Sequence, residues 1–590
     1  METFTALVAA VNGIIWHDYA LLTVLGVGVL FTLWSGFGQY RALTHGVAVI
    51  RGKYDDKRDP GAINHFQALS TALSATVGLG NIAGVAIAIS LGGPGALFWM
   101  WIVGIVGMAL KMTEVTQSML FRDTSNPDNP HGGPMWVCKR GFAQLNPALA
   151  PLGAIVGAIF CVTLMVSTAT GGNMFQAWNV ADISFTYFGV PHWIAGLILT
   201  LAVGAVIVGG IRRIGEVAGR LVPFMCLLYM LGGIAVIIVN VEQIPAMFAL
   251  IFTEAFSPSE GAGAFIGGTA GYGFLKGMQR AFFSSEAGQG SAPIAHSAAK
   301  TDEPVREGVV AGLEPFIDTL VVCSITGLVI LLSGEWNRAP SLAYSEPPAI
   351  ERVFANGEPV LTASGLAQWQ VSPVRVSIAD EIDTSAQMRE GAVLFIVLEA
   401  GVNSETGMNR HRVFGTLTGS DEVGWTAEFD PFAAPPGVTP TIAVDGVYLD
   451  LKGATLTAKA FDRVFPGLGL WIVPFAVWLF AFSTIISWSY YGEQGMIYLL
   501  GQRAVMPYRV VYCLLIMVSV QLVRTQDQLD LFSTFGTGVM LWANVPIMLI
   551  FGPLAMRAYR DYIHRLRSGQ MEPAHAAPRF ADVVGGRDIR

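Results

Sequence analysis

The sequence predicts an all-α membrane protein of about eleven transmembrane helices, with a small extracytoplasmic β domain inserted between the eighth and ninth helices. Three observations predict this fold class. Of all residues, 53% are hydrophobic and 13% charged, whereas about 25% are charged in soluble proteins. Many apolar runs approach the roughly 20 residues that cross a bilayer as a helix. One long segment lacks such runs and is rich in β-branched residues instead.

Window hydropathy predicts the helices one by one along the chain. They are expected at 19–36, 67–90, 94–120, 151–173, 192–210, 216–240, 263–283, 307–333, 467–490, 507–523 and 529–556. Lys and Arg follow the first, third and fifth helices, whereas the connections "GGPG", 174–191 and 241–262 contain neither. Because basic connections stay on the cytoplasmic side, we expect a multi-pass protein of the plasma (inner) membrane with its N-terminus outside.

The segment 334–465 separates two groups of helices. It carries 17 Asp and Glu against 9 Lys and Arg. Stretches such as "AVLFIVLEAG" and "TIAVDGVYLDLKGATLTAK" are β-branched, and Asp445-Gly446 is a turn signal. This predicts four regions: helices in 1–333, the extracytoplasmic β insert in 334–465, helices in 466–556, and a cytoplasmic basic tail in 557–590. A lid, a spacer and a surface for an unknown partner all remain open as roles for the insert.

Several classes of function are excluded by what the sequence lacks. There is no GxxxxGK[ST] nucleotide motif, no catalytic constellation, and no long basic face for nucleic acid. The five cysteines show no metal-type spacing. We therefore expect that the protein is not an enzyme and holds no cofactor. Its expected partners are the lipid bilayer and small solutes.

Glycine interrupts two of the predicted helices. Span 67–90 contains "TVGLGNIAG", and span 263–283 contains Gly267, Gly268, Gly271 and Gly273. If the first helix is set aside, these are the first and sixth of ten, so that each opens a set of five. Interrupted helices at matching positions of two halves indicate a transporter binding site, where free N–H groups hold a carboxylate and free C=O groups hold a cation. The alternative is close helix packing through small residues.

Distinctive motifs lie outside the insert. They read "TVGLGNIAGVAIAI", "GGPGALFWMWIVGIVGMALKMTE", "FFSSEAGQGSAPIAHSAAKT", "EPFIDT" and "WSYYGEQ". They resemble the alanine or glycine:cation symporter family. The resemblance implies a LeuT-like fold of five-plus-five inverted repeats after an extra N-terminal helix, and uptake of alanine or glycine coupled to Na⁺ or H⁺. The acidic insert departs from the usual family pattern, and it motivates the alternative of an amino-acid sensor that signals through the insert.

The resemblance also implies roles for individual residues. The amides around Leu79 and Gly80 would receive the substrate carboxylate, and a second wall would take its ammonium and methyl groups. The implied substrate-binding residues are Thr76, Gly78, Leu79, Gly80 and Asn81 in the first break, and Gly268, Thr269, Ala270 and Gly271 in the facing wall. The implied Na⁺-binding residues are Thr76, Val77, Ser483, Thr484 and Ser487. Back-bonding of these hydroxyls to the preceding turn is the alternative.

Charged residues inside apolar spans form a last set of candidates. Asp318 lies near mid-depth, where a charge is expected to have a function and a partner, and we expect that partner to be Lys276 or Arg280. A structural ion pair and a proton or gating role both remain open for this network. Glu114 is expected to pair with Lys111 at i,i+3. His296 is expected to make a structural or gating contact. Asn173 and Gln176 are further polar candidates near the pocket.

Overall fold

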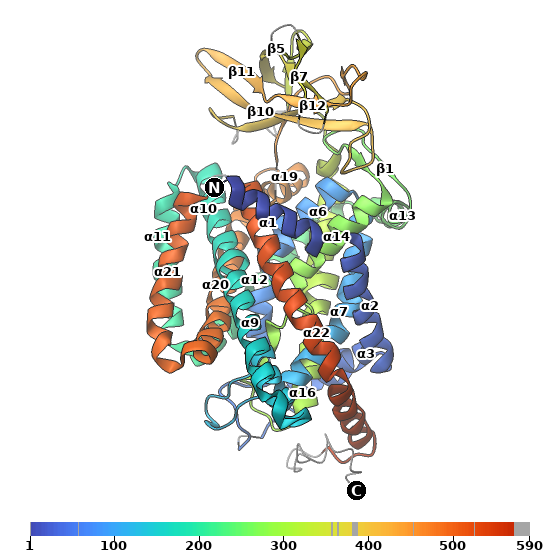
Figure 1. The fold of residues 1–590 in the computed structure, drawn as a ribbon. Coiled ribbons are helices and arrows are strands. Elements are labelled where there is room, and N and C mark those ends of the chain that lie inside the picture. The colour runs from blue at the N-terminus through green and yellow to red at the C-terminus, as the bar shows by residue number, and fades with distance from the viewer. Residues whose placement is uncertain are drawn as a thin grey trace.

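A bundle of helices with a β-rich cap at one end makes up the computed structural model (Figure 1). It describes residues 2–571 except 57, 356–357, 363–364, 380–387, 452 and 524–525. Helix α1 (Glu2–Ile15) lies at the same end of the bundle as the β-rich cap, and the last helix, α22 (Gln526–Arg567), ends at the opposite end.

Most of the helices follow the predicted apolar runs, but helices Phe175–Phe188 and Ile244–Glu254 lie in expected connections, and helix Glu2–Ile15 was not predicted. In chain order they are α1 (Glu2–Ile15), α2 (Asp18–Trp34), α3 (Gly38–Arg41), η1 (Ala42–Gly46), α4 (Val47–Ile50), α5 (His65–Thr76), η2 (Gly80–Gly84), α6 (Val85–Gly92), α7 (Gly95–Phe121), α8 (Pro134–Leu145), η3 (Pro147–Leu149), α9 (Ala150–Ala169), η4 (Thr170–Met174), α10 (Phe175–Phe188), α11 (His192–Ile207), α12 (Gly210–Val239), η5 (Val241–Gln243), α13 (Ile244–Glu254), α14 (Ala270–Ser285), α15 (Ala292–His296), α16 (Pro304–Ala311), η6 (Phe316–Cys323), α17 (Ser324–Ser333), η7 (Glu335–Asn337), α19 (Ala454–Val464), α20 (Leu468–Leu500), η8 (Gln502–Ala504), α21 (Val505–Leu522) and α22 (Gln526–Arg567).

The number of membrane spans depends on how bent helices are counted. Within the described residues, seven helices are long and apolar enough to cross a membrane, and nine if two bent pairs each count as one span. Those pairs bend by 48° between α1 and α2 and by 50° between α5 and α6. The structure therefore supports a multi-pass helical protein, while the count of eleven stays a prediction.

The predicted β-rich segment is present between α17 and α19. Its strands are β3 (Leu342–Tyr344), β4 (Ile350–Arg352), β5 (Phe354–Ala355), β6 (Glu358–Pro359), β7 (Ala367–Val371), β8 (Val374–Ile378), β9 (Val393–Glu399), β10 (Arg410–Ser420), β11 (Gly424–Phe429), β12 (Phe432–Ala434), β13 (Thr441–Ile442) and β14 (Tyr448–Leu449). The main sheet runs β13-β9-β10-β11-β8-β3, all antiparallel. In β9, the five residues from Leu394 to Leu398 are buried, so its apolar run forms the centre of the cap.

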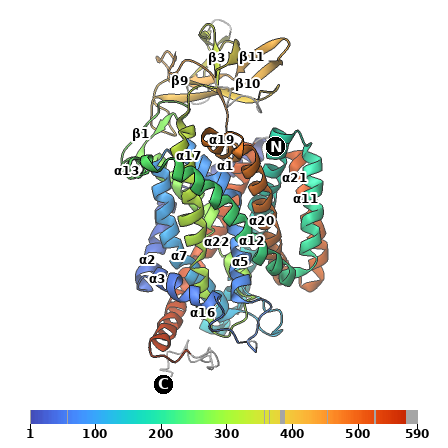
Figure 2. The ribbon, with the colours of Figure 1, turned by 180° about the vertical axis from the view of Figure 1, so that it is seen from behind.

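One boundary of the insert differs from the sequence interpretation. The last part of the predicted β insert forms helix α19, which lies between the cap and the bundle (Figure 2). Thr457 of α19 donates a hydrogen bond to the backbone oxygen of Ile82, at 3.0 Å. Arg412 of β10 also reaches the bundle and donates to the backbone oxygen of Ser90, at 3.0 Å. The cap is thus attached directly to the second half of the first interrupted helix.

Candidate functional site

The predicted break in the first interrupted helix is present. Helix α5 ends at Thr76, and the chain resumes helical geometry at Leu79, directly before η2 begins at Gly80. Val77 has φ −74° and ψ 83°, outside the helical region. Asn81 bridges the gap, because its Oδ1 accepts a hydrogen bond from the Gly78 amide at 2.9 Å. The side chain of Asn81 therefore holds the unwound segment against the start of the next helix.

The second break lies further along the chain than the sequence suggested. The prediction placed it at Gly267–Gly273, but α14 begins at Ala270 and continues through Gly271 and Gly273 to Ser285. The Thr269 hydroxyl starts this helix by accepting from the Tyr272 amide at 3.3 Å. The chain is instead unwound over 286–291, before the short helix α15.

Left-handed backbone causes this second break. Glu286 has φ 52°, and Gly288 and Gly290 each have φ 82°. Three left-handed residues within five positions cannot continue a right-handed helix. At Gly290 a side chain is also excluded, since an added Cβ would lie 2.5 Å from Pro134 Cγ. The motif that carried the family resemblance, "EAGQGS", is therefore the break itself.

The residues predicted to form the facing wall consequently do not lie at the second break. They are Gly268, Thr269, Ala270 and Gly271. Gly268 pairs with Ser259 in the β1 (Ser259–Glu260) and β2 (Gly267–Gly268) ladder. The Thr269 amide donates to the backbone oxygen of Thr406 in the insert, at 2.9 Å. These residues form the junction with the β-rich cap, and the cavity described next does not include them.

A small cavity lies between the two breaks. It encloses about 20 Å³, which is room for about one water molecule. It is lined by Ala75, Thr76, Gly78, Gly80, Ser167, Gly171, Gln176, Phe283, Glu286, Gln289, Thr484, Trp488 and Thr537. Thr76, Gly78, Gly80 and Thr484 were candidates from sequence, and Gln176 was suspected to be nearby. The sequence interpretation missed Phe283, Glu286 and Gln289, because it placed the second break too early.

Close contacts set the shape of this cavity. A Cβ added to Gly80 would lie 3.0 Å from Ser284 Cβ, so the first break packs directly on α14. The Leu79 amide donates to Gln176 Oε1 at 3.4 Å, which places α10 on the third side. Glu286 accepts from Trp488 Nε1 at 2.9 Å. Of the residues that line the cavity, Glu286 alone carries a carboxylate.

The candidate Na⁺-binding hydroxyls lie beside the first break. The backbone oxygen of Ser74 accepts hydrogen bonds from Thr484 at 3.1 Å and from Ser483 at 3.3 Å. Ser74 in turn donates its hydroxyl to the Ser483 backbone oxygen at 2.6 Å. A Cβ at Gly78 would lie 2.5 Å from Thr484 Oγ1. Carbonyl and hydroxyl oxygens of this kind suit a small hard cation, and Ser74 is a residue that the sequence interpretation missed.

The remaining cation candidates differ in their surroundings. Ser487 Oγ is buried and makes no hydrogen bond to the described residues. Thr76 bonds back to the Ala72 backbone oxygen at 3.3 Å, the alternative that back-bonding predicted. Val77 remains at the end of α5, where its amide bonds to the Leu73 backbone oxygen at 2.7 Å. Asn173, which was expected only as a polar residue near the pocket, bonds to the Tyr512 backbone oxygen and does not line the cavity.

Asp318 supports the first break through neutral donors, and its expected charged partners lie elsewhere. Its carboxylate accepts from Asn81 Nδ2 at 2.5 Å, from Ser284 Oγ at 2.9 Å and from Thr319 Oγ1 at 2.7 Å. Since Asn81 holds the Gly78 amide, Asp318 fixes the side chain that shapes the break.

The other members of the predicted charge network also bind different partners. Lys276 lies over the Tyr272 ring, 5.1 Å from its centre. Arg280 pairs with Asp530 at 3.1 Å. Glu114 accepts from the Gly290 amide at 3.1 Å and from Asn544 Nδ2 at 3.0 Å, so it supports the second break.

Lys111 pairs with Glu314 at 3.2 Å instead of with Glu114. The expected i,i+3 pair and the Asp318 ion pair are therefore both wrong. Contacts across the bundle determine these partners, and spacing along one helix does not reveal them.

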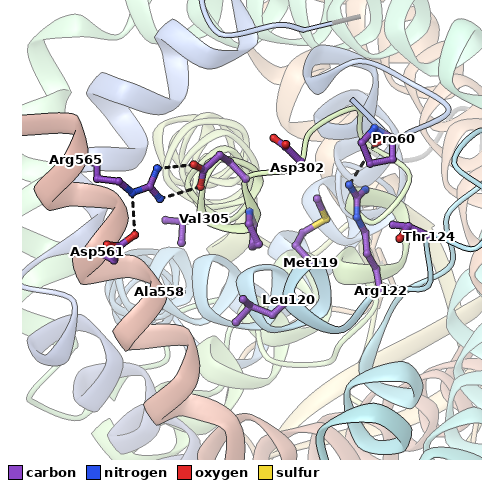
Figure 3. A pocket seen from close by; sticks show the side chains of 12 residues that line it. Pro60, Met119, Leu120, Arg122, Thr124, Asp302, Val305, Ala558, Asp561 and Arg565 are labelled. Atoms are coloured by element: carbon purple, nitrogen blue, oxygen red, sulfur yellow. Dashed lines mark hydrogen bonds and ion pairs between the residues drawn. The ribbon is translucent and has the colours of Figure 1, made fainter. Parts of the chain in front are cut away.

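Toward the C-terminal end, a second hollow of about 230 Å³ lies among the ends of α7, α16 and α22 (Figure 3). Arg565 of α22 reaches across it and binds both oxygens of Glu303, at 2.6 and 3.1 Å. On the other side, Arg122, which directly follows α7, donates to the backbone oxygens of Ser297 and Ala299, both at 2.8 Å. These contacts close this end of the bundle beneath the second break.

Beside this closed end, the ionised form of one loop carboxyl group, that of Asp59, is disfavoured. Burial and the neighbouring Asp302 carboxylate raise the pKa of Asp59 above its ordinary value. The Pro60 backbone oxygen, next in the chain, accepts from Arg122 at 3.2 Å. Opening this end therefore requires several polar contacts to separate together.

Comparison with known proteins identifies the family to which the chain belongs. The chain matches the family described as "Sodium:alanine symporter family" over residues 1–363 and 438–577, which leaves the middle of the β insert unmatched. "Sodium/alanine symporter AgcS" of Methanococcus maripaludis is 35% identical over 511 residues, covering 87% of each chain.

Other relatives match over nearly the full length. An "uncharacterized transporter" of Haemophilus influenzae is 29% identical, covering 96% of this chain and 97% of the other. "Putative sodium/proton-dependent alanine carrier protein YrbD" of Bacillus subtilis is 28% identical, covering 95% and 93%.

Proposed function

Because the chain belongs to the sodium:alanine symporter family, we propose that it is a secondary active symporter, which imports alanine, glycine or both by alternating access, coupled to Na⁺ or H⁺. Relatives named as a sodium/alanine symporter and as a sodium/proton-dependent alanine carrier support this activity. They give no support to the sensor alternative. The single structural observation that carries the proposal is the small cavity between two broken helices.

In this proposal the amino acid binds across the two breaks. Its carboxylate is received by the amides near Gly80, where the start of η2 and α6 offers a favourable helix dipole. Its ammonium group lies toward Glu286, the carboxylate in the lining. The side-chain methyl faces Phe283. A closed cavity of about 20 Å³ must widen to admit any amino acid, and each added methylene costs more widening, which favours the smallest substrates.

The Na⁺ ion is assigned to the oxygens around Ser74, Thr484 and Ser487. One cation crossing about 100 mV supplies about 2.3 kcal/mol, and a tenfold concentration gradient adds about 1.4 kcal/mol. Together these permit accumulation of a neutral solute by roughly several hundredfold. A single coupled cation is therefore sufficient for import.

We further propose the finer features of the fold on the same basis: eleven spans, a LeuT-like five-plus-five repeat, and an orientation with the N-terminus and the insert outside. The two breaks support the repeat, since each would open one set of five helices. The orientation is supported by Figure 1, in which the insert and α1 lie at one end of the bundle and α22 ends at the other.

Uptake of radiolabelled alanine into proteoliposomes tests the function. Accumulation should require an inward Na⁺ or H⁺ gradient. If Na⁺ drives it, accumulation should be lost when choline replaces Na⁺ and the pH is equal on both sides. Thr484→Val should weaken the response to Na⁺. Thr163→Val is the matched control, because the Thr163 hydroxyl bonds only within its own helix, to the Phe160 backbone oxygen. Alanine uptake that responds to neither gradient would contradict the proposal.

A further inference from the structure

A row of buried acid and base side chains lies between the second break and the C-terminal end of the bundle. His296 of α15 stands at its centre. Its Nδ1 lies 2.5 Å from Glu307 Oε1, and its Nε2 lies 2.8 Å from Glu314 Oε1. All three side chains are completely buried.

The two contacts of His296 need one more proton than a neutral histidine and two ionised carboxylates would supply. A neutral imidazole has one N–H donor, and an ionised carboxylate only accepts. If Glu307, His296 and Glu314 were in those forms, one ring nitrogen would face a carboxylate oxygen with no hydrogen between them. An added proton, on the ring or on a carboxyl group, satisfies both contacts.

The surrounding charges favour the added proton. Lys111 and Glu114 face the cluster from α7, and Glu286 faces it from the second break, with Lys111 acting electrostatically on Glu314, Glu114 and Glu286. With His296 neutral, Lys111 would thus face these three buried carboxylates, which is costly in a medium that solvates charge poorly. Arg122, which directly follows α7, acts on Glu307 from the C-terminal side. The Tyr491 side chain faces Glu286, Glu314 and Glu114 from α20.

The row continues to the surface. His65, the first residue of α5, contacts Glu307 Oε2 through its Nδ1. Its Nε2 lies 3.9 Å from Asp55 Oδ1, and the Asp55 side chain is 45% exposed. In the other direction Glu314 meets Lys111 at 3.2 Å, near Glu286 in the cavity wall. Both α5 and α16 approach the C-terminal end of the bundle in Figure 2.

We propose that Glu307, His296 and Glu314 hold a transported proton, which exchanges with the C-terminal aqueous side through His65 and Asp55, so that alanine import carries H⁺ together with Na⁺. This inference rests on the proposed function. Histidine and carboxylate chains inside membrane proteins serve as proton relays. The proton balance is simple: one proton enters from the insert side when the site is open there, and the same proton leaves through His65 and Asp55.

Proteoliposomes with pyranine trapped in weakly buffered lumen test the proton. In the wild-type protein, alanine should acidify the lumen. With Na⁺ equal on both sides, an inward pH gradient of one unit should drive accumulation of up to about tenfold. His296→Gln should abolish the alanine-dependent acidification. Alanine binding in Na⁺, measured by scintillation proximity, should change less than about threefold, because His296 does not line the cavity.

His131→Gln is the matched control, since His131 lies in a loop and contacts Gln494 outside this row. It should acidify the lumen as the wild type does. Na⁺-driven uptake without acidification in the wild type would overturn the inference and leave the proposed function intact. So would acidification that persists in His296→Gln. If His296→Gln does not fold, the wild-type response to the pH gradient alone decides. Failure of all alanine uptake would instead contradict the proposed function.

Discussion

Gly80→Ala should damage transport, whereas Gly84→Ala should not. Both residues belong to η2, so the two changes alter the same turn by the same methyl group. At Gly80 the added carbon would lie 3.0 Å from Ser284 Cβ and 3.1 Å from Ser284 Cα. At Gly84 the nearest atom is Arg280 Cδ at 3.9 Å, an ordinary contact.

The size of the effect follows from the crowding. Forcing a methyl group into a packed site costs about 1–3 kcal/mol, which corresponds to about 5- to 150-fold in an equilibrium constant. At Gly80 we expect this loss in alanine affinity, because the crowding pushes the first break away from α14. Initial rates of uptake over a range of alanine concentrations measure it, with scintillation-proximity binding as a second readout. Equal behaviour of the two variants would refute the contact on which the site is built.

Three further predictions concern other parts of the site. Asp318→Asn should weaken alanine binding by about 5- to 150-fold, since a lost acceptor leaves buried donors unpaired at a cost of about 1–3 kcal/mol; binding equal to that of Asp462→Asn, a control outside the cavity, would contradict this. Gly271→Ala should leave alanine uptake near the wild-type rate, because an added Cβ meets only Thr269 Oγ1 at 4.0 Å. A strong loss of uptake would support the placement of the facing wall that was predicted from the sequence. Thr484→Val should raise the Na⁺ concentration for half-maximal uptake by about tenfold, as expected for roughly 1.4 kcal/mol lost with one oxygen ligand, and an unchanged Na⁺ dependence would remove Thr484 from the ion site.

Local sequence signals located the first break but misplaced the second. The first break is held by residues within "VGLGN" itself, because Asn81 is close enough in sequence to bond the Gly78 amide. In the second interrupted helix, glycines are spread over about two turns before the break. Gly271 and Gly273 are tolerated within α14, whereas Gly288 and Gly290 are required by their left-handed backbone. Counting glycines does not separate these two uses.

Contacts between distant segments account for most of what the sequence did not reveal. Glu114 of α7 and Gly290 of the unwound segment 286–291 lie far apart in the chain and bond at 3.1 Å. The pairing of Lys111 with Glu314 is equally non-local. An i,i+3 rule describes an exposed helix face, but Lys111 is fully buried and takes its partner from the neighbouring helix.

The two buried carboxylates that were expected to form ion pairs have a shared role instead. Asp318 holds the first break through Asn81 and also holds α14 through Ser284. Glu114 holds the second break, which follows directly on α14. Because α14 connects these contacts, we expect a shift at one break to disturb the contacts of the other. A ligand that binds the amides near Gly80 is then expected to act on the segment that contains Glu286, and through it on the proton-holding row behind that residue. Substrate and cation can be coupled in this way without any direct contact between them.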